Sequence, residues 1–219
     1  MMDYKILFID EEETQHDQFL DYFELVCPEI TPKCMFPTST IEEMLGIIEE
    51  IKPDAIVTDF KLNDIKINIK YTVKYNGIDL IKSIRGQMDD FPCFVVTSFD
   101  DDAVNDTDDV NLVYIKDVLK TKKDNDKAKV TFAERIISQI DKYQSKIGNA
   151  KKELMTLLDK RKAGNATAAD EEKIIELDTF LEKTYDNTFV VPKEMKTMSN
   201  LDRLNTLINQ VDELLKKLD

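Results

Sequence analysis

Short apolar runs alternate with longer stretches of helical periodicity over the first two thirds of the chain, and this alternation constrains the fold most. Five runs of three to five apolar residues occur, at 5–9, 33–36, 54–59, 93–96 and 112–115. Short apolar runs bounded by turn residues are typical of buried strands. Strands that alternate with helices imply right-handed crossovers and a parallel sheet with both faces covered. The pattern therefore predicts a doubly wound α/β domain with five parallel strands.

The intervening helices carry apolar stripes at spacings of three and four residues. The first stripe consists of Phe19, Leu20, Phe23 and Val26, and on this helix we expect His16, the only histidine, to face solvent. Ser39 and Glu42 have the spacing of a capping box before the second helix, whose stripe consists of Ile41, Met44, Leu45, Ile48 and Ile51. A third helix is expected to begin just after Asn76-Gly77.

Two stretches interrupt the alternation. Apolar residues occupy every second position from 65 to 75, which predicts an added hairpin or an edge strand. Residues 99–111 contain six Asp and no helical stripe, which indicates a loop or a poorly formed helix.

The last third of the sequence is helical throughout. A heptad seam predicts one long helix, with apolar residues at Ala133, Ile136, Ile140, Tyr143, Ile147, Ala150, Leu154 and Leu157. Thr167 with Asp170, and Ser199 with Asp202, predict the starts of two further helices. We therefore divide the chain into an α/β domain at 1–145 and a helical hairpin or three-helix region at 146–219. The stripes bury one another, or they pair with a second copy in a homodimer.

Charge and cysteine content limit the classes of partner. The net charge is −14; residues 1–130 hold 15 Lys/Arg and 28 Asp/Glu, whereas residues 131–219 hold 15 and 16. This balance argues against a nucleic-acid or anionic-membrane partner. Three cysteines without CxxC spacing are typical of reduced thiols. The first apolar run is too short for a signal-peptide core and no run is long enough to span a membrane, so we expect a cytoplasmic protein.

Polar residues follow the strands at the points where parallel strands form a common rim. Asp10 and Glu11 follow the first strand, Asp59 ends the third, Thr97 the fourth and Lys116 the fifth. Converging carboxylates repel one another unless a divalent cation binds, and hard oxygen ligands favour Mg²⁺. A hydroxyl and an ammonium group beside them suit a phosphoryl group, with the Asp59 carboxylate as nucleophile. The alternatives are that the acids are merely solvated and that Lys116 is a surface lysine.

Five motifs in this order resemble the receiver domain of two-component response regulators over about residues 3–145. They are Asp10-Glu11, Ile56-Val57-Thr58-Asp59, Asn76-Gly77-Ile78-Asp79-Leu80, Val95-Val96-Thr97-Ser98 and Tyr114-Ile115-Lys116. The resemblance implies a flavodoxin-like fold with Asp59 as phosphoacceptor. It assigns Asp10, Glu11, Asp59 and the main-chain carbonyl of Lys61 to Mg²⁺, and Thr97 and Lys116 to the phosphoryl group. The donor would be a sensor histidine kinase or a histidine phosphotransfer protein.

The sequence departs from receivers at two positions near Lys116. Asp117 replaces the usual proline, so a trans peptide is expected there and the direction of Lys116 stays open. Val113 replaces the switch aromatic, with Tyr114 adjacent.

These features favour a response regulator that signals to a protein effector through its helices. We do not expect a turnover enzyme; the only chemistry expected is self-catalysed phosphoryl transfer and autodephosphorylation. A phosphorylation-independent, receiver-like adaptor is the alternative. A dehalogenase-type phosphohydrolase would need Asp-x-Asp where Asp59-Phe60-Lys61 stands.

Overall fold

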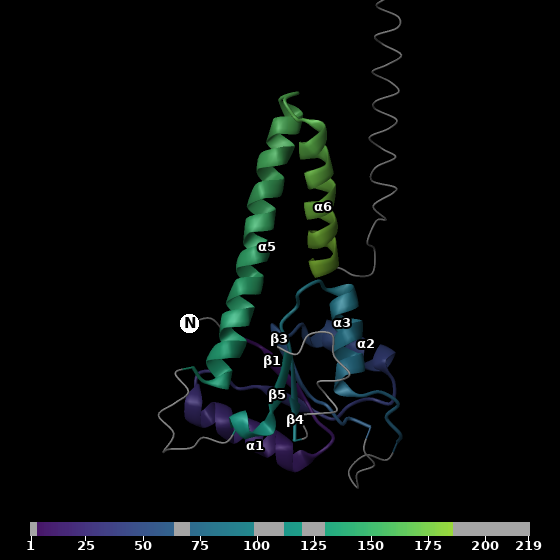
Figure 1. The fold of residues 1–219 in the computed structure, drawn as a ribbon, viewed down its shortest axis with the longest axis vertical. Helices are drawn as coiled ribbons and strands as arrows, with labels where there is room; N and C mark the ends of the chain where they lie inside the picture. The colour runs from purple at the N-terminus through teal and green to yellow at the C-terminus, as the bar shows by residue number, and fades with distance from the viewer. Residues whose placement is uncertain (1–3, 64–70, 99–111, 120–129, 186–219) are drawn as a thin grey trace, which may run out of the picture. The chain divides into compact units, whose positions relative to one another are not determined.

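The computed structural model describes residues 4–63, 71–98, 112–119 and 130–185. The chain divides into two compact units, Met1–Gln144 and Ser145–Asp219. The first contains a sheet with its covering helices, and the second contains helices (Figure 1). The 99–111 segment and the helix predicted near 199–218 lie outside the described residues.

All five predicted strands form one parallel sheet. Its spatial order is β2-β1-β3-β4-β5, and every neighbouring pair is parallel. The strands are β1 (Ile6–Ile9), β2 (Lys33–Met35), β3 (Ala55–Asp59), β4 (Cys93–Thr97) and β5 (Val113–Ile115). This is the flavodoxin-like order, with strand succession reversing direction between β1 and β3. The predicted fold class is therefore confirmed.

The three central strands are buried on both sides because helices cover both faces of the sheet. Every residue of β1, β3 and β4 is buried. Alternate residues, such as Phe8, Val57 and Phe94, join one core cluster with α1 (Glu13–Val26). Helices α2 (Ile41–Ile51) and α3 (Gly77–Gln87) lie on the other side of the sheet (Figure 1).

Side-chain caps are present at the starts of α2 and α3, whereas the N-cap of α1, Glu12, forms no side-chain cap hydrogen bond. Helix α3 begins at Gly77, one residue before its predicted start. Asn76 and Asp79 form a reciprocal capping box at α3, with hydrogen bonds of 2.9 and 3.1 Å. At α2 the capping residue is Thr40, whose side chain accepts from the Glu43 N–H at 3.3 Å. The predicted Ser39–Glu42 box is therefore wrong by one position. Ser39 instead donates to the Glu43 carboxylate.

The alternating segment after β3 does not add a strand in its described part. Residues 71–76 have no strand conformation, and residues 64–70 lie outside the described residues. Val73 and Tyr75 are buried, and the Tyr71 hydroxyl donates to the Pro37 carbonyl. Contacts with the loop before α2 thus replace sheet pairing, because apolar side chains at every second position can also be buried by irregular extended chain.

Helix α5 (Phe132–Lys162) is the predicted long helix, and its first part belongs to the core of the first unit. Phe132, Ala133, Ile136 and Ile140 are buried in the cluster that contains α1 and the sheet. The Phe132 ring packs against Tyr114 and Phe94, with ring centroids 5.0 and 5.8 Å away. The first half of the heptad seam is therefore core packing against a sheet.

The second unit contains the rest of α5 and α6 (Ala168–Tyr185) as a helical hairpin. Its core consists of Ala150, Leu157, Ile174 and Leu177. Gly164, with φ of 73°, lies in the connection, and Thr167 and Asp170 form the predicted cap of α6. The C-terminal helices are thus confirmed for the described residues.

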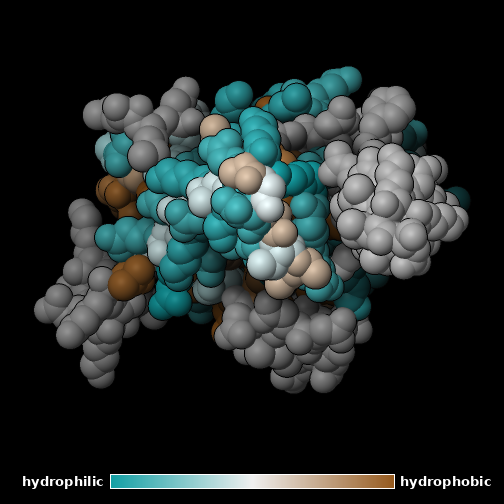
Figure 2. Space-filling model, turned by 90° about the horizontal axis from the view of Figure 1, so that it is seen from above, coloured by the Kyte–Doolittle hydropathy of each residue, from teal (hydrophilic) through white to brown (hydrophobic). Residues whose placement is uncertain are grey.

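The coloured surface in Figure 2 is mainly hydrophilic, with apolar side chains in small groups. Large apolar side chains that are exposed include Leu25, Ile115 and Met155. Among the described residues, no helix is both long enough and apolar enough to cross a membrane. All three cysteines are free thiols, and Cys27 and Cys93 are buried.

Candidate functional site

The parallel sheet brings the predicted strand-end residues to one edge. Asp10 directly follows β1, Asp59 and Thr97 are the last residues of β3 and β4, and Lys116 directly follows β5. Because all strands run in the same direction, their carboxyl ends form the rim at which open α/β sheets bind ligands. Asp59 pairs with Val96 in the sheet register, so Thr97 ends the neighbouring strand one residue further on.

Three carboxylates converge at this rim. One oxygen from each of Asp10, Glu11 and Asp59 lies within 4.8 Å of the others. The three residues are only 0%, 3% and 4% exposed, so bulk water screens their mutual repulsion weakly. Buried like charges at this distance require a cation or protons.

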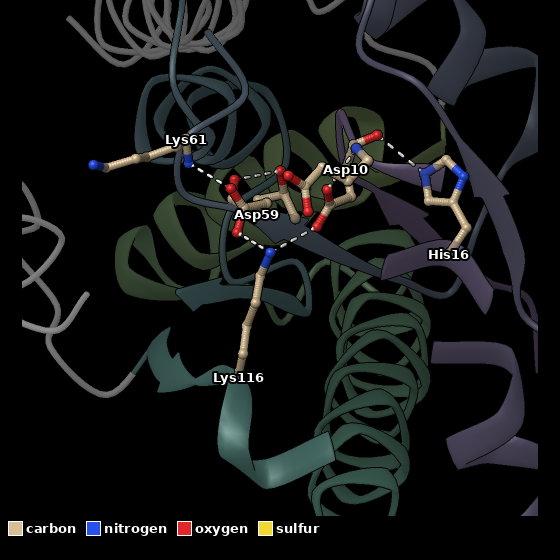
Figure 3. A network of polar contacts seen from close by, with 7 residues as sticks. Asp10, His16, Asp59, Lys61 and Lys116 are labelled. Carbon is tan, nitrogen blue, oxygen red and sulfur yellow. Dashed lines mark hydrogen bonds and ion pairs between the residues drawn. The ribbon is translucent and has the colours of Figure 1, made fainter. Parts of the chain in front are cut away.

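Lys116 supplies one positive charge to the cluster. Its ammonium nitrogen lies 2.8 Å from Asp59 Oδ1 and 3.0 Å from Asp10 Oδ2 (Figure 3). The described chain contains no cis peptide bond, so the expected trans peptide before Asp117 is present. Lys116 nevertheless reaches the acids, which resolves the direction that the sequence left open. Burial lowers the pKa of Lys116, but Asp59 and Asp10 outweigh that effect and raise it overall.

Main-chain hydrogen bonds fix the orientation of both strand-end aspartates. The Glu12 N–H donates to Asp10 Oδ1 at 2.9 Å, and the Lys61 N–H donates to Asp59 Oδ2 at 2.7 Å. The Lys61 side chain points away from the carboxylates in Figure 3, so this residue acts there through its main chain. Each aspartate thus has one oxygen held by the backbone and the other directed at Lys116.

Burial and repulsion make two of the acids weak. Burial, with the nearby Asp59 carboxylate, raises the pKa of Asp10 to about 6. Burial, with Asp10 and Asp59, raises the pKa of Glu11 to about 8. The ionised cluster is therefore short of positive charge even with Lys116 in place.

Helix α3 packs directly under Asp59, a contact that sequence reasoning missed. The Gly77 N–H donates to the Phe60 carbonyl at 2.8 Å. A Cβ at Gly77 would lie 2.1 Å from the Asp59 carbonyl oxygen, so only glycine fits. The Asn76-Gly77 pair indicated a helix start, but a close approach between two backbones leaves no separate signal in the sequence.

His16 is buried next to the site, and its predicted exposure is wrong. It is 8% exposed, and its Nε2 lies 3.0 Å from the Asp10 carbonyl oxygen. Phe8 and Phe36 flank the ring. The buried face of α1 is centred on His16, Phe19, Tyr22 and Phe23, while Leu20 and Val26 are only half-buried. The apolar stripe alone did not show that a polar ring would share this face.

The donor set fits a small, hard divalent cation. Mg²⁺ binds carboxylate and carbonyl oxygens and retains several water ligands. The carboxylates of Asp10, Glu11 and Asp59 could hold it, and a cation there would offset the repulsion that weakens Asp10 and Glu11. The roles of the Lys61 carbonyl and of Thr97, which is 2% exposed, remain predictions from the resemblance.

Comparisons with known proteins give structural likenesses only. No protein-family model and no curated protein sequence matches the chain. Among solved structures it is similar to the response regulator RcsB of Salmonella typhimurium, with 15% identity, a TM-score of 0.43, and coverage of 92% of this chain and 78% of RcsB. A CheY-like receiver domain from Methylobacillus flagellatus has 16% identity and a TM-score of 0.37, with coverage of 64% and 99%.

A third similar structure is the anti-anti-sigma factor PhyR of Bartonella quintana, with 17% identity and a TM-score of 0.42. The match covers 69% of this chain and 52% of PhyR, so this chain spans about half of that protein's length. RcsB has also been solved in complex with DNA. The structural neighbours thus include a response regulator and a receiver domain, and at these identities the likeness concerns the fold.

Proposed function

We propose that this protein is a two-component response regulator that accepts a phosphoryl group on Asp59 in the presence of Mg²⁺. The observation that supports this most is the buried convergence of Asp10, Glu11 and Asp59 within 4.8 Å, together with the Lys116 ion pairs. Such a cluster is costly to bury, since three carboxylates lose their hydration. It suits a site that binds a cation and a dianionic group.

The chemical step is transfer of a phosphoryl group from a phosphohistidine of a sensor kinase or phosphotransfer protein. Asp59 Oδ1 forms the new O–P bond while the P–N bond breaks, and the histidine nitrogen leaves with the electron pair. Bound Mg²⁺ would neutralise charge on the phosphoryl oxygens. Lys116 then pairs with the phosphoryl group, and the Thr97 hydroxyl donates to it. The protein acts as acceptor and signal carrier, with self-catalysed transfer and autodephosphorylation as its only chemistry.

The proposed output is contact with a protein effector. The helical region 131–219 has 15 Lys/Arg and 16 Asp/Glu, a balance that does not favour a DNA phosphate backbone. The helical hairpin offers a mixed, charged surface on which a protein partner, or a second copy, can dock. Weak or absent retention on DNA at low salt, alongside measurable binding of a protein effector, is the expected result.

A stable phosphoryl mimic tests the acceptor site directly. Wild-type protein incubated with Mg²⁺ and beryllofluoride should form an adduct visible by ¹⁹F NMR, and acetyl phosphate should give an acid-stable, base-labile phosphoprotein. Asp59→Asn removes the nucleophilic oxygen, so it should form neither product. If the wild type forms no Mg²⁺-dependent adduct, or if Asp59→Asn forms the same one, the proposal is wrong.

A phosphorylation-independent adaptor is the second candidate, and the packing of β5 favours it. Val113 stands at the switch position, while the adjacent Tyr114, which is half-buried, packs against Phe94 and Phe132. This arrangement lacks a free aromatic side chain at that position to follow a phosphoryl group. An adaptor would bind its effector equally well as wild type and as Asp59→Asn, which affinity measurements on the two proteins would show.

A further inference from the structure

His16 occupies a buried position between the first strand and the loop after the second. Its ring lies edge-on to Phe8, at 5.9 Å between centroids, and tilted against Phe36, at 4.9 Å. A polar ring between two phenyl rings is unfavourable unless its nitrogen has a hydrogen-bond partner. That partner is the carbonyl oxygen of Asp10, 3.0 Å from Nε2 (Figure 3).

The direction of this hydrogen bond follows from the chemistry of its two atoms. A carbonyl oxygen can only accept, so Nε2 carries the proton and donates. An apolar side chain in this place could fill the space between Phe8 and Phe36, but it would leave the Asp10 carbonyl without this donor.

Every polar group of Asp10 has a hydrogen-bond partner, and main-chain groups or His16 supply all of these partners except the one at Oδ2, which is Lys116. Its N–H donates to the Met35 carbonyl at 3.3 Å, and its Oδ1 accepts from the Glu12 N–H. His16 holds the carbonyl, which belongs to the peptide that joins Asp10 to Glu11. The remaining oxygen, Oδ2, points to Lys116 and the other carboxylates. Rotation of the Asp10–Glu11 peptide would move both acids together.

We propose that His16 is a positioning residue that fixes the Asp10–Glu11 peptide, so that both carboxylates face the cation beside Asp59. The inference rests on the proposed function, because the cation site is part of it. Groups that orient metal ligands in this way typically change metal affinity by about 10–100-fold when they are removed. His16 thus contributes to Mg²⁺ affinity in addition to filling the core.

The test measures Mg²⁺ affinity and thermal stability separately in four full-length proteins. Calorimetric titration with MgCl₂ gives the Kd, and circular dichroism gives the Tm. His16→Leu should bind Mg²⁺ about 10–100-fold more weakly than wild type. His16→Gln, whose amide N–H can reach the Asp10 carbonyl, should recover most of the affinity. Phe23→Leu, a buried change on the same helix, should lower the Tm and leave the Kd unchanged.

The outcomes separate this inference from the proposed function. Wild-type protein without Mg²⁺ binding would overturn both. If folded His16→Leu binds Mg²⁺ with wild-type affinity, only the positioning role is overturned. The same holds if Phe23→Leu weakens Mg²⁺ binding as much as His16→Leu does. If His16→Leu fails to fold, His16→Phe replaces it, because a phenyl ring fills the space between the two phenylalanines but has no N–H. Weaker Mg²⁺ binding by His16→Phe would support the positioning role, and wild-type affinity would overturn it. Reduced beryllofluoride occupancy at fixed Mg²⁺ should accompany the weaker Kd.

Discussion

Gly77 shows how a single missing side chain allows α3 to pack against the end of β3 at Asp59. Because a Cβ there would lie 2.1 Å from the Asp59 carbonyl oxygen, Gly77→Ala must push α3 and β3 apart. We predict a loss of about 1–3 kcal/mol in the free energy of unfolding, as for other overpacked sites. Urea denaturation measures it. Gly86→Ala on the same helix is the control, since nothing lies within 4 Å of its Cβ, and it should be neutral or stabilising. Equal stability of the two variants would contradict the close contact.

Glu11 should make the metal-free protein less stable as the pH rises. Its pKa is raised from 4.5 to about 8, so the folded protein holds a proton that the unfolded chain releases across this range. The folded state binds more protons there, and the free energy of unfolding therefore falls from about pH 4.5 to 8. Glu11→Gln removes this contribution, so its urea midpoint, measured with EDTA, should fall less steeply than that of wild type.

The same urea denaturation is repeated with added Mg²⁺ in place of EDTA. Because the cation binds ionised carboxylates, it should raise the wild-type midpoint most near pH 8 and have a smaller effect on Glu11→Gln. Parallel pH curves for the two proteins in EDTA would contradict the burial of an ionisable Glu11.

Helix α5 is attached to α1 by a buried hydrogen bond at its first turn. The Ala133 N–H donates to the Tyr22 hydroxyl at 3.0 Å, and both residues are buried. Tyr22→Phe leaves this N–H without its partner, so we predict a loss of about 1–3 kcal/mol in the free energy of unfolding. Tyr4→Phe is the matched control, because its hydroxyl bond to Asp141 is solvent-exposed and should contribute less. Chemical denaturation of both variants would distinguish them, and a larger effect at Tyr4 would contradict the prediction.

The elements follow from local sequence pattern, whereas their exact ends and buried faces do not. Apolar runs and helical stripes indicated all five strands and the α-helices of the described residues, but not the 3₁₀ helix at Lys116–Leu119. The α2 cap is at Thr40 rather than Ser39 because either side chain has a suitable oxygen, and only the entry path of the chain selects one. Alternation at 71–75 reflects burial of Val73 and Tyr75 without a strand, since a period of two reports which side is buried and not which partner is hydrogen-bonded.

The two units have separate apolar cores, so damage to one should leave the other folded. The cores share no residue, although α5 contributes to both. Leu157→Ala creates a cavity in the hairpin core and should cost about 2–5 kcal/mol there. Hydrogen exchange should accelerate in α6 and remain unchanged in the sheet. Met155→Ala, at an exposed position of the same helix, should change neither, and equal acceleration in the sheet would show that the units unfold together.

The amino-acid sequence alone determined the sheet, its parallel direction and the polar residues at its rim, because strand and helix periods and strand-end residues are local properties of the chain. Tertiary structure decided how Lys116 reaches Asp10 and Asp59, why Gly77 must be glycine and that His16 is buried. It also decided that the heptad seam is shared between two cores. These features depend on which distant residues cover a given face, and periodicity specifies only that the face is apolar, not what covers it.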